Sequence, residues 1–215
     1  MKKTILSLLF AGVSMCANAI DMTLPGAGNV RYGVEAGLNE SKTRMDDYEF
    51  LAGFNFGAKA EYSLSDNLFV DGQFNFARKG GVAVSETNIP LIGKKRTEKD
   101  FKLSYLQLSI GAGYRFAVTN TFGIAPHVGF FGAYGIASEL EDSNDEPFAD
   151  LDFKKGDFGF DLGLNFDLGK NFQLSAGVDL GLIQIRDDEK LYGNTIIDYS
   201  DMKTISWYQR FTYFF

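Results

Sequence analysis

The sequence predicts an all-β protein that folds as an eight-stranded antiparallel up-and-down β-barrel. Eight segments alternate apolar and polar residues, a pattern typical of strands with one apolar and one polar face. The connections between these segments alternate between short and long, as they do in up-and-down barrels. The last segment alternates up to an aromatic terminal residue, Phe215.

The first four segments comprise residues 30–38, 50–62, 68–78 and 101–116. In the first three, one parity is mostly apolar and the other is mostly polar or glycine. The fourth changes parity, because its apolar residues stand at odd positions from Phe101 to Tyr105 and at even positions from Leu106 to Tyr114. We therefore predict a β-bulge near Tyr105–Leu106, where one additional residue would restore the pattern.

The other four segments comprise residues 122–136, 157–168, 172–185 and 203–215. The sixth is the most regular, since all its even positions from Phe158 to Leu168 are apolar and all its odd positions are glycine, aspartate or asparagine. One face of the last segment carries Trp207, Phe211, Tyr213 and Phe215. Its other face carries Ser206, Tyr208, Arg210, Thr212 and Phe214.

The connections fall into two classes. The short ones contain residues 65–67, 119–120 and 169–171, which are types that favour turns. The long ones are residues 39–49, 79–100, 137–156 and 186–202. We expect tight turns at one end of the barrel and long loops at the other.

The apolar face is expected to point outward into lipid. An eight-stranded barrel has an interior just wide enough for side chains to fill. Large residues such as Phe54, Phe74 and Phe160 are too numerous on the apolar face for that space, whereas the other face is rich in glycine, serine and asparagine. A soluble barrel with its apolar face inward is the alternative. We predict an eight-stranded antiparallel up-and-down transmembrane β-barrel.

Residues 1–19 are predicted to be a cleaved signal peptide. Two lysines precede a short apolar run over residues 5–13, and Ala17-Asn18-Ala19 fits the small-x-small cleavage rule. Cleavage before Ile20 leaves residues 20–215 as a single barrel domain.

The signal also removes the only cysteine, Cys16. Lipidation of Cys16 is the alternative, but Met15 occupies the preceding position, where a lipoprotein signal needs a small residue. The mature chain then has no disulfide and no thiol chemistry. The formal charge of −7 becomes −9 when the two signal lysines are lost, which argues against nucleic-acid binding.

The terminal pattern Trp207-x-x-x-Phe211-x-Tyr213-x-Phe215 and the segment 103–109 resemble the small outer-membrane β-barrel proteins, or porin family, of Gram-negative bacteria. Segment 103–109 departs from the family pattern at Ser109, where proline is usual. The resemblance implies an outer-membrane location, an eight-stranded barrel and a terminal strand that the barrel-assembly machinery reads. It implies no single function, because such barrels serve as pores, adhesion or defence proteins and structural components.

Charged residues on the polar parity are candidates for a lumen network. They are Arg31, Glu35, Lys59, Glu61, Asp71, Arg115, Asp157, Asp161, Asp167, Asp179 and Arg210. Their mixed signs favour ion pairs that fill a closed barrel, because a buried charge without a partner is costly. The alternative is a narrow ion path, and the excess of acidic residues would make it prefer cations.

We expect no catalytic residues, no metal site and no cofactor. His127, the only histidine, has inward parity, and the mature chain offers no cysteine or second histidine as a zinc ligand. No G-x-S-x-G motif is present. A lipid- or peptide-hydrolysing enzyme is the remote alternative.

The leading hypothesis is a non-enzymatic envelope barrel with a structural or surface-interaction role, and the second is a porin-type channel for small ions or solutes. Expected partners are outer-membrane lipids and lipopolysaccharide, together with the barrel-assembly machinery. The basic residues 93–96 would contact lipopolysaccharide phosphates, and bridging cations would act at the acidic run 139–146. We expect a monomer that binds no nucleic acid.

Overall fold

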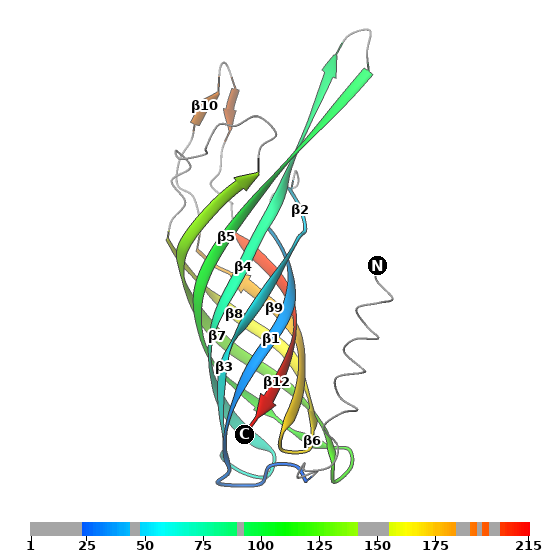
Figure 1. The fold of residues 1–215 in the computed structure, drawn as a ribbon, viewed down its shortest axis with the longest axis vertical. Coiled ribbons are helices and arrows are strands. Elements are labelled where there is room, and N and C mark those ends of the chain that lie inside the picture. The colour runs from blue at the N-terminus through cyan, green and yellow to red at the C-terminus, as the bar shows by residue number, and fades with distance from the viewer. Residues whose placement is uncertain are drawn as a thin grey trace.

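The computed structural model describes residues 23–43, 48–89, 93–141, 155–183, 190–192, 195–197 and 203–215. The predicted signal peptide, residues 1–19, lies outside these ranges. Eight long strands form a closed barrel (Figure 1). They are β1 (Val30–Thr43), β3 (Leu51–Ser63), β4 (Leu68–Ile89), β5 (Gly93–Tyr114), β7 (Phe122–Glu141), β8 (Gly156–Leu168), β9 (Phe172–Gly181) and β12 (Thr204–Phe214).

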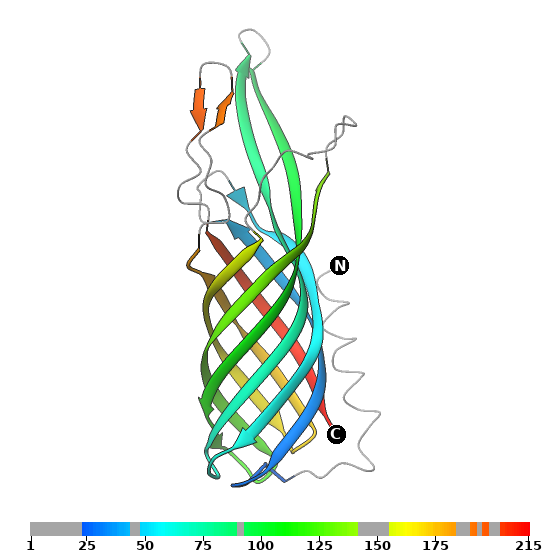
Figure 2. The same cartoon turned by 90° about the vertical axis from the view of Figure 1, so that its left-hand side faces the viewer.

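Each long strand pairs antiparallel with the next, and β12 pairs with β1 to close the barrel. Closure provides hydrogen-bond partners for backbone groups that an open edge would leave exposed. Short strands extend the barrel: β2 (Tyr48–Glu49) pairs with β4, and β6 (Phe116–Ala117) pairs with β7. A separate hairpin of β10 (Lys190–Tyr192) and β11 (Thr195–Ile197) lies beyond one end (Figure 2).

The predicted short connections are tight turns, and they share one end of the barrel, here called the turn end. Ser65 Oγ accepts a hydrogen bond from the Leu68 N–H at 2.9 Å, and Thr119 Oγ1 accepts one from the Phe122 N–H at 3.0 Å. Gly169 has a φ of 68°, a conformation that glycine adopts at little cost. The C-terminus lies at the same end (Figure 1).

The apolar face points outward, as predicted. Ile110 and Phe56 are 63% and 52% exposed, whereas their inward neighbours Ser109 and Asn55 are buried. The described part of the chain contains no helix long and apolar enough to cross a membrane.

The prediction of a long loop over residues 79–100 was wrong. Instead β4 and β5 continue as paired strands to Ile89 and Gly93, and form a hairpin that extends beyond the barrel (Figure 2). The apolar–polar alternation ends here because a hairpin outside the barrel has no lipid to face. Residues 82–87 still favour a strand, since Val82, Val84 and Thr87 are β-branched.

The predicted bulge is present, but its additional residue belongs to the neighbouring strand. The register shifts between Ser104 and Tyr105, which pair with Ala137 and Gly135, so Ile136 of β7 is the additional residue. Strand β5 keeps its parity throughout. Leu103 and Tyr105 therefore point inward and are buried, and the change in apolar parity marks apolar residues inside the barrel.

Candidate functional site in the barrel lumen

The inward face of the strands forms a lumen filled with charged side chains. All eleven charged residues with inward parity lie there, and each is at most 5% exposed: Arg31, Glu35, Lys59, Glu61, Asp71, Arg115, Asp157, Asp161, Asp167, Asp179 and Arg210. A twelfth charged residue, Lys79, is also buried there. It falls within the segment predicted to be a loop, so its inward position was missed.

Four of these residues form a turn-end layer, namely Arg31, Glu61, Arg115 and Asp167. The Arg31 guanidinium donates to Glu61 at 2.8 Å and to Asp167 at 2.7 Å. Arg115 donates to the same two carboxylates, at 2.7 Å to Glu61 and 2.8 Å to Asp167. Arg31, Glu61 and Asp167 lie on β1, β3 and β8, and Arg115 directly follows β5. The Arg31–Glu61 pair joins neighbouring strands, whereas the other three pairs join strands that are not adjacent in the barrel and so cross the lumen.

Two inward aromatic rings cover the turn-end layer. The Arg31 Cζ lies 4.0 Å from the centroid of Phe214, and the Arg115 Cζ lies 4.9 Å from that of Phe69. Guanidinium groups over aromatic faces are stabilised by the ring quadrupole. The rings and the ion pairs therefore lie in contact at this level of the lumen.

The segment before β1 crosses the same end. The Leu24 N–H donates to Asn120 O at 3.1 Å, and the Ala27 N–H donates to Asp66 Oδ1 at 3.0 Å. Residues 23–29 therefore contact two different turns and lie across the turn end of the barrel. The sequence carried no evident signal for this contact.

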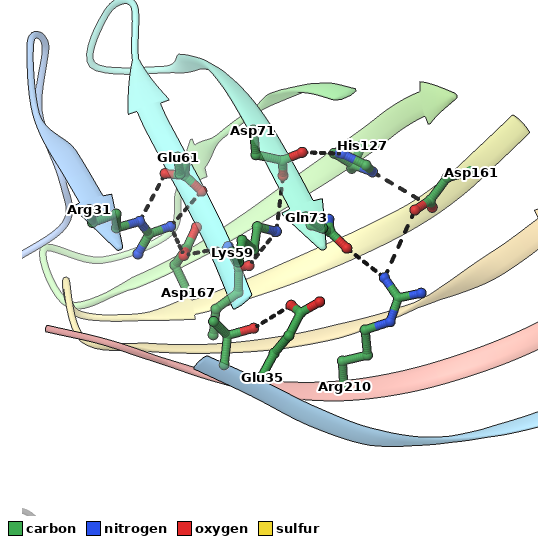
Figure 3. Close-up of polar contacts among 12 residues, drawn as sticks. Arg31, Glu35, Lys59, Glu61, Asp71, Gln73, His127, Asp161, Asp167 and Arg210 are labelled. Atoms are coloured by element: carbon green, nitrogen blue, oxygen red, sulfur yellow. Dashed lines mark hydrogen bonds and ion pairs between the residues drawn. The ribbon is translucent and has the colours of Figure 1, made fainter. Parts of the chain in front are cut away.

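A middle layer surrounds Asp71 and His127 (Figure 3). Lys59 Nζ lies 2.9 Å from Asp71 Oδ2 and donates to Gln173 Oε1 at 2.9 Å. His127 Nε2 lies 3.1 Å from Asp71 Oδ1, and its Nδ1 lies 3.8 Å from Asp161 Oδ1. Gln173 also donates to Asp167 at 3.0 Å, which joins this layer to the turn-end layer.

Arg210 is the central cation of the middle layer. Its guanidinium donates to Gln73 at 2.6 Å and lies 4.0 Å from Asp161 and 3.9 Å from Asp179. The ring of Tyr208 packs against it at 3.8 Å. Glu35, on β1, accepts hydrogen bonds instead from Asn75 at 2.6 Å and Thr212 at 3.2 Å.

A loop-end layer completes the network. Lys79 Nζ donates to Asp179 at 3.0 Å and lies 4.7 Å from the centroid of Phe131. Thr204 donates to Asp157 at 2.7 Å. Every level of the lumen therefore contains side chains joined across it by polar contacts.

The inward aromatic residues were not predicted to fill the lumen. They are Phe69, Tyr105, Phe131, Tyr208 and Phe214. Several lie against glycine on a neighbouring strand: a Cβ on Gly113 would overlap Phe69, and one on Gly159 would overlap Phe131. An inward glycine in register with an inward aromatic residue is the sequence signal that could have located them.

The charged side chains of the lumen contact mainly one another and neighbouring polar side chains. The buried charges comprise seven carboxylates and five cations, listed by the layers above, within the described residues. No group of three or more histidine, cysteine, aspartate or glutamate side chains in the described ranges is arranged to hold a metal ion. The lumen therefore holds carboxylates that accept from cations, such as Asp167 and Asp179, and carboxylates that accept from neutral donors, such as Glu35 and Asp157.

The terminal strand has the two faces that its sequence indicates. Trp207, Tyr213 and Phe215 are exposed on the outside, and Phe211 is half-buried beside them. Phe172 of β9 packs against Phe211 and Tyr213, with centroid distances of 5.7 and 5.3 Å. An aromatic cluster thus surrounds the C-terminus on the outer surface.

The sequence matches the outer membrane protein β-barrel domain family over residues 5–215. The chain belongs to this family. It is therefore an integral outer-membrane protein. In barrels of this kind the tight turns lie in the periplasm and the long loops outside the cell.

Solved structures that are similar to this chain include three bacterial proteins. One is Ail, the attachment invasion locus protein of Yersinia pestis, in complex with the heparin analogue sucrose octasulfate. Ail is 15% identical to this chain, the match covers 87% of this chain and 99% of Ail, and the TM-score is 0.45. Neisserial surface protein A is 16% identical, with 87% and 99% covered and a TM-score of 0.49. OprG from Pseudomonas aeruginosa is 15% identical, with 92% and 99% covered and a TM-score of 0.45. A search of curated proteins found no match.

Proposed function

We propose that this outer-membrane barrel is non-enzymatic and closed, and that it has a structural or surface-interaction role. The observation that supports this proposal is the set of ion pairs that cross the lumen, above all those of the turn-end layer that join Arg31 to Asp167 and Arg115 to Glu61 and Asp167. Buried pairs of this kind are costly to break singly, because each leaves an uncompensated charge. The absence of an enzymatic role is supported by His127, which is 6% exposed and held between two carboxylates.

A narrow, cation-preferring channel is the second candidate. Among the described residues, the lumen buries seven carboxylates and only five cations. This excess of negative charge favours a channel that prefers cations. The two candidates differ in whether the lumen contains a continuous water path.

Ion flux from proteoliposomes separates them. The mature protein is refolded into vesicles loaded with potassium chloride, and folding is verified by a change of gel mobility on boiling. We expect potassium efflux at the rate of protein-free vesicles. Rapid, potassium-selective efflux through the folded protein would instead support the channel.

The proposed surface interactions lie on the β4–β5 hairpin. Its register places Lys94, Lys95 and Arg96 beside the hairpin tip, opposite Asn88, Thr87 and Glu86. This position beyond the membrane suits contact with lipopolysaccharide phosphates. Replacing the three basic residues with glutamate should weaken binding to lipopolysaccharide vesicles, and unchanged binding would argue against this partner.

The terminal strand of Trp207, Phe211, Tyr213 and Phe215 is the proposed contact for the barrel-assembly machinery, and we propose a monomeric state.

A further inference from the structure

A groove of ≈ 350 Å³ lies on the outer surface where β1, β12 and β9 meet. Its outward residues are Leu38, Glu40, Ala176, Trp207 and Gln209. The register places Ala176, Gln209 and Leu38 in one row across the three strands, and Val178, Trp207 and Glu40 in the next row toward the loop end. Ala176 is the smallest of these outward residues and lies at one end of its row.

The groove is lined mainly by apolar surface, but two polar residues lie within it where a lipid-facing surface is usually apolar. Gln209 and Glu40 are both exposed on the outward face. The rows nearer the periplasm return to apolar residues, with Phe211 between Leu174 and Ala36. No hydrogen bond links the Gln209 side chain to another described residue. A carboxamide in contact with hydrocarbon is costly unless a ligand supplies a hydrogen bond.

Basic residues lie above the groove at the loop end. Lys42 shares the outward parity of Glu40, and its Nζ lies 5.1 Å from the centroid of Phe50. Lys203 shares the outward parity of Trp207 on the neighbouring strand. From outside the cell inward, the surface therefore presents ammonium groups, then a carboxylate and a carboxamide beside tryptophan, then apolar residues.

We propose that this groove binds an acyl chain of an anionic, amide-bearing glycolipid of the outer leaflet, the chemistry of the lipid A part of lipopolysaccharide. Lys42 and Lys203 contact its phosphate, while Gln209 and Glu40 hydrogen-bond its acyl amide or hydroxyl. A second copy of the barrel fits less well, since two concave surfaces do not fill each other and a two-fold contact places the two Glu40 carboxylates near each other. The inference rests on the outer-membrane location and is independent of whether the lumen is closed.

Native mass spectrometry of the refolded mature protein tests the site, with diphosphoryl lipid A and phosphatidylglycerol as probes. The wild type should retain one lipid A and prefer it to phosphatidylglycerol, which is anionic but has no acyl amide. Ala176→Leu fills the groove and Gln209→Leu removes the carboxamide, and each should weaken lipid A binding about tenfold. Ala58→Leu is the matched control, because Ala58 is exposed on the same outward face away from the groove.

Replacing both lysines, as Lys42→Gln with Lys203→Gln, should abolish the preference for diphosphoryl over dephosphorylated lipid A. Boiling-dependent gel mobility verifies that every variant is folded. Equal lipid A binding by the wild type and both groove variants would overturn the proposal, and so would equal retention of phosphatidylglycerol. A wild-type dimer that dissociates in Ala176→Leu would overturn it in favour of a second copy. Vesicle efflux is measured separately, so a failure here leaves the closed lumen untouched.

Discussion

At the scale of single residues, Arg115 shows how the lumen charges depend on one another. It is 1% exposed and contacts both Glu61 and Asp167. Arg115→Ala leaves two carboxylates sharing Arg31 alone, and breaking a buried pair in this way costs about 3–5 kcal/mol. Urea unfolding in lipid vesicles, followed by fluorescence of the only tryptophan, Trp207, measures this loss.

Two control variants test whether the loss of stability comes from the buried ion pairs. Lys155→Ala removes an exposed cation and should change the unfolding free energy by less than about 0.5 kcal/mol. Arg115→Ala combined with Asp167→Ala removes one charge of each sign, and should cost less than the sum of the single changes. Additive costs would mean that the two side chains do not interact in the folded protein.

Packing of aromatic rings on glycine gives a second prediction at this scale. A Cβ on Gly113 would overlap the Phe69 ring and lie 2.9 Å from Pro126 O. Gly113→Ala should therefore destabilise the barrel by about 1–3 kcal/mol through overpacking. The same change should cost less in a Phe69→Ala background, because the ring is gone. An equal cost in both backgrounds, from the same unfolding assay, would show that the backbone contact alone is responsible.

At the scale of elements, strands were predictable from parity only within the membrane. Alternation located the inner part of every long strand, because lipid outside and a polar interior impose opposite demands on successive residues. It failed for residues 79–100, which begin with Lys79 inside the lumen and continue as a hairpin beyond the barrel, where no lipid imposes alternation. Alternation also assigned the bulge to β5 instead of β7, because Leu103 and Tyr105 are apolar yet point inward. The register between β5 and β7 depends on both strands, so the sequence of β5 alone does not locate the additional residue.

The terminal strand, β12, carries a prediction of its own. Deleting Phe215, or changing it to aspartate, should lower the amount of folded protein in the outer membrane, because we propose that the assembly machinery reads this end. Phe116→Asp is the matched control, since Phe116 is also an exposed aromatic residue near the turn end. Quantifying the heat-modifiable band in membrane fractions separates the two. Equal losses in both variants would indicate a general cost of charge at the interface rather than recognition.

The β4–β5 hairpin should be dispensable for the barrel. Deleting residues 84–98 and joining Ala83 to Lys99 through a two-residue Asn-Gly turn keeps the pairing of those two residues. The removed strands pair with each other beyond the barrel, so the unfolding free energy should change by no more than about 1 kcal/mol. A large destabilisation would mean that the hairpin packs on the barrel. The deletion should also remove the lipopolysaccharide contact proposed for its basic tip.

At the scale of the whole molecule, the ring of eight strands and its outward apolar face followed from the sequence, because a narrow interior leaves one arrangement for so many phenylalanines. The inward charges followed from parity as well. The partners of these charges could not be predicted, since contacts such as Arg31–Asp167 join strands that are distant in the sequence. Closure of the barrel determines which side chains meet across the lumen. The turn-end crossing by residues 23–29 likewise depends on tertiary contacts.

Single-channel conductance in a planar bilayer tests the closed lumen most directly. Wild-type protein is compared with a variant that has alanine at Arg31, Glu61, Arg115 and Asp167, each verified as folded by its gel mobility before and after boiling. We expect a silent wild type and a measurable rise in conductance for the variant, because the turn-end layer obstructs the water path. Discrete, cation-selective steps from the wild type would contradict it and establish a channel.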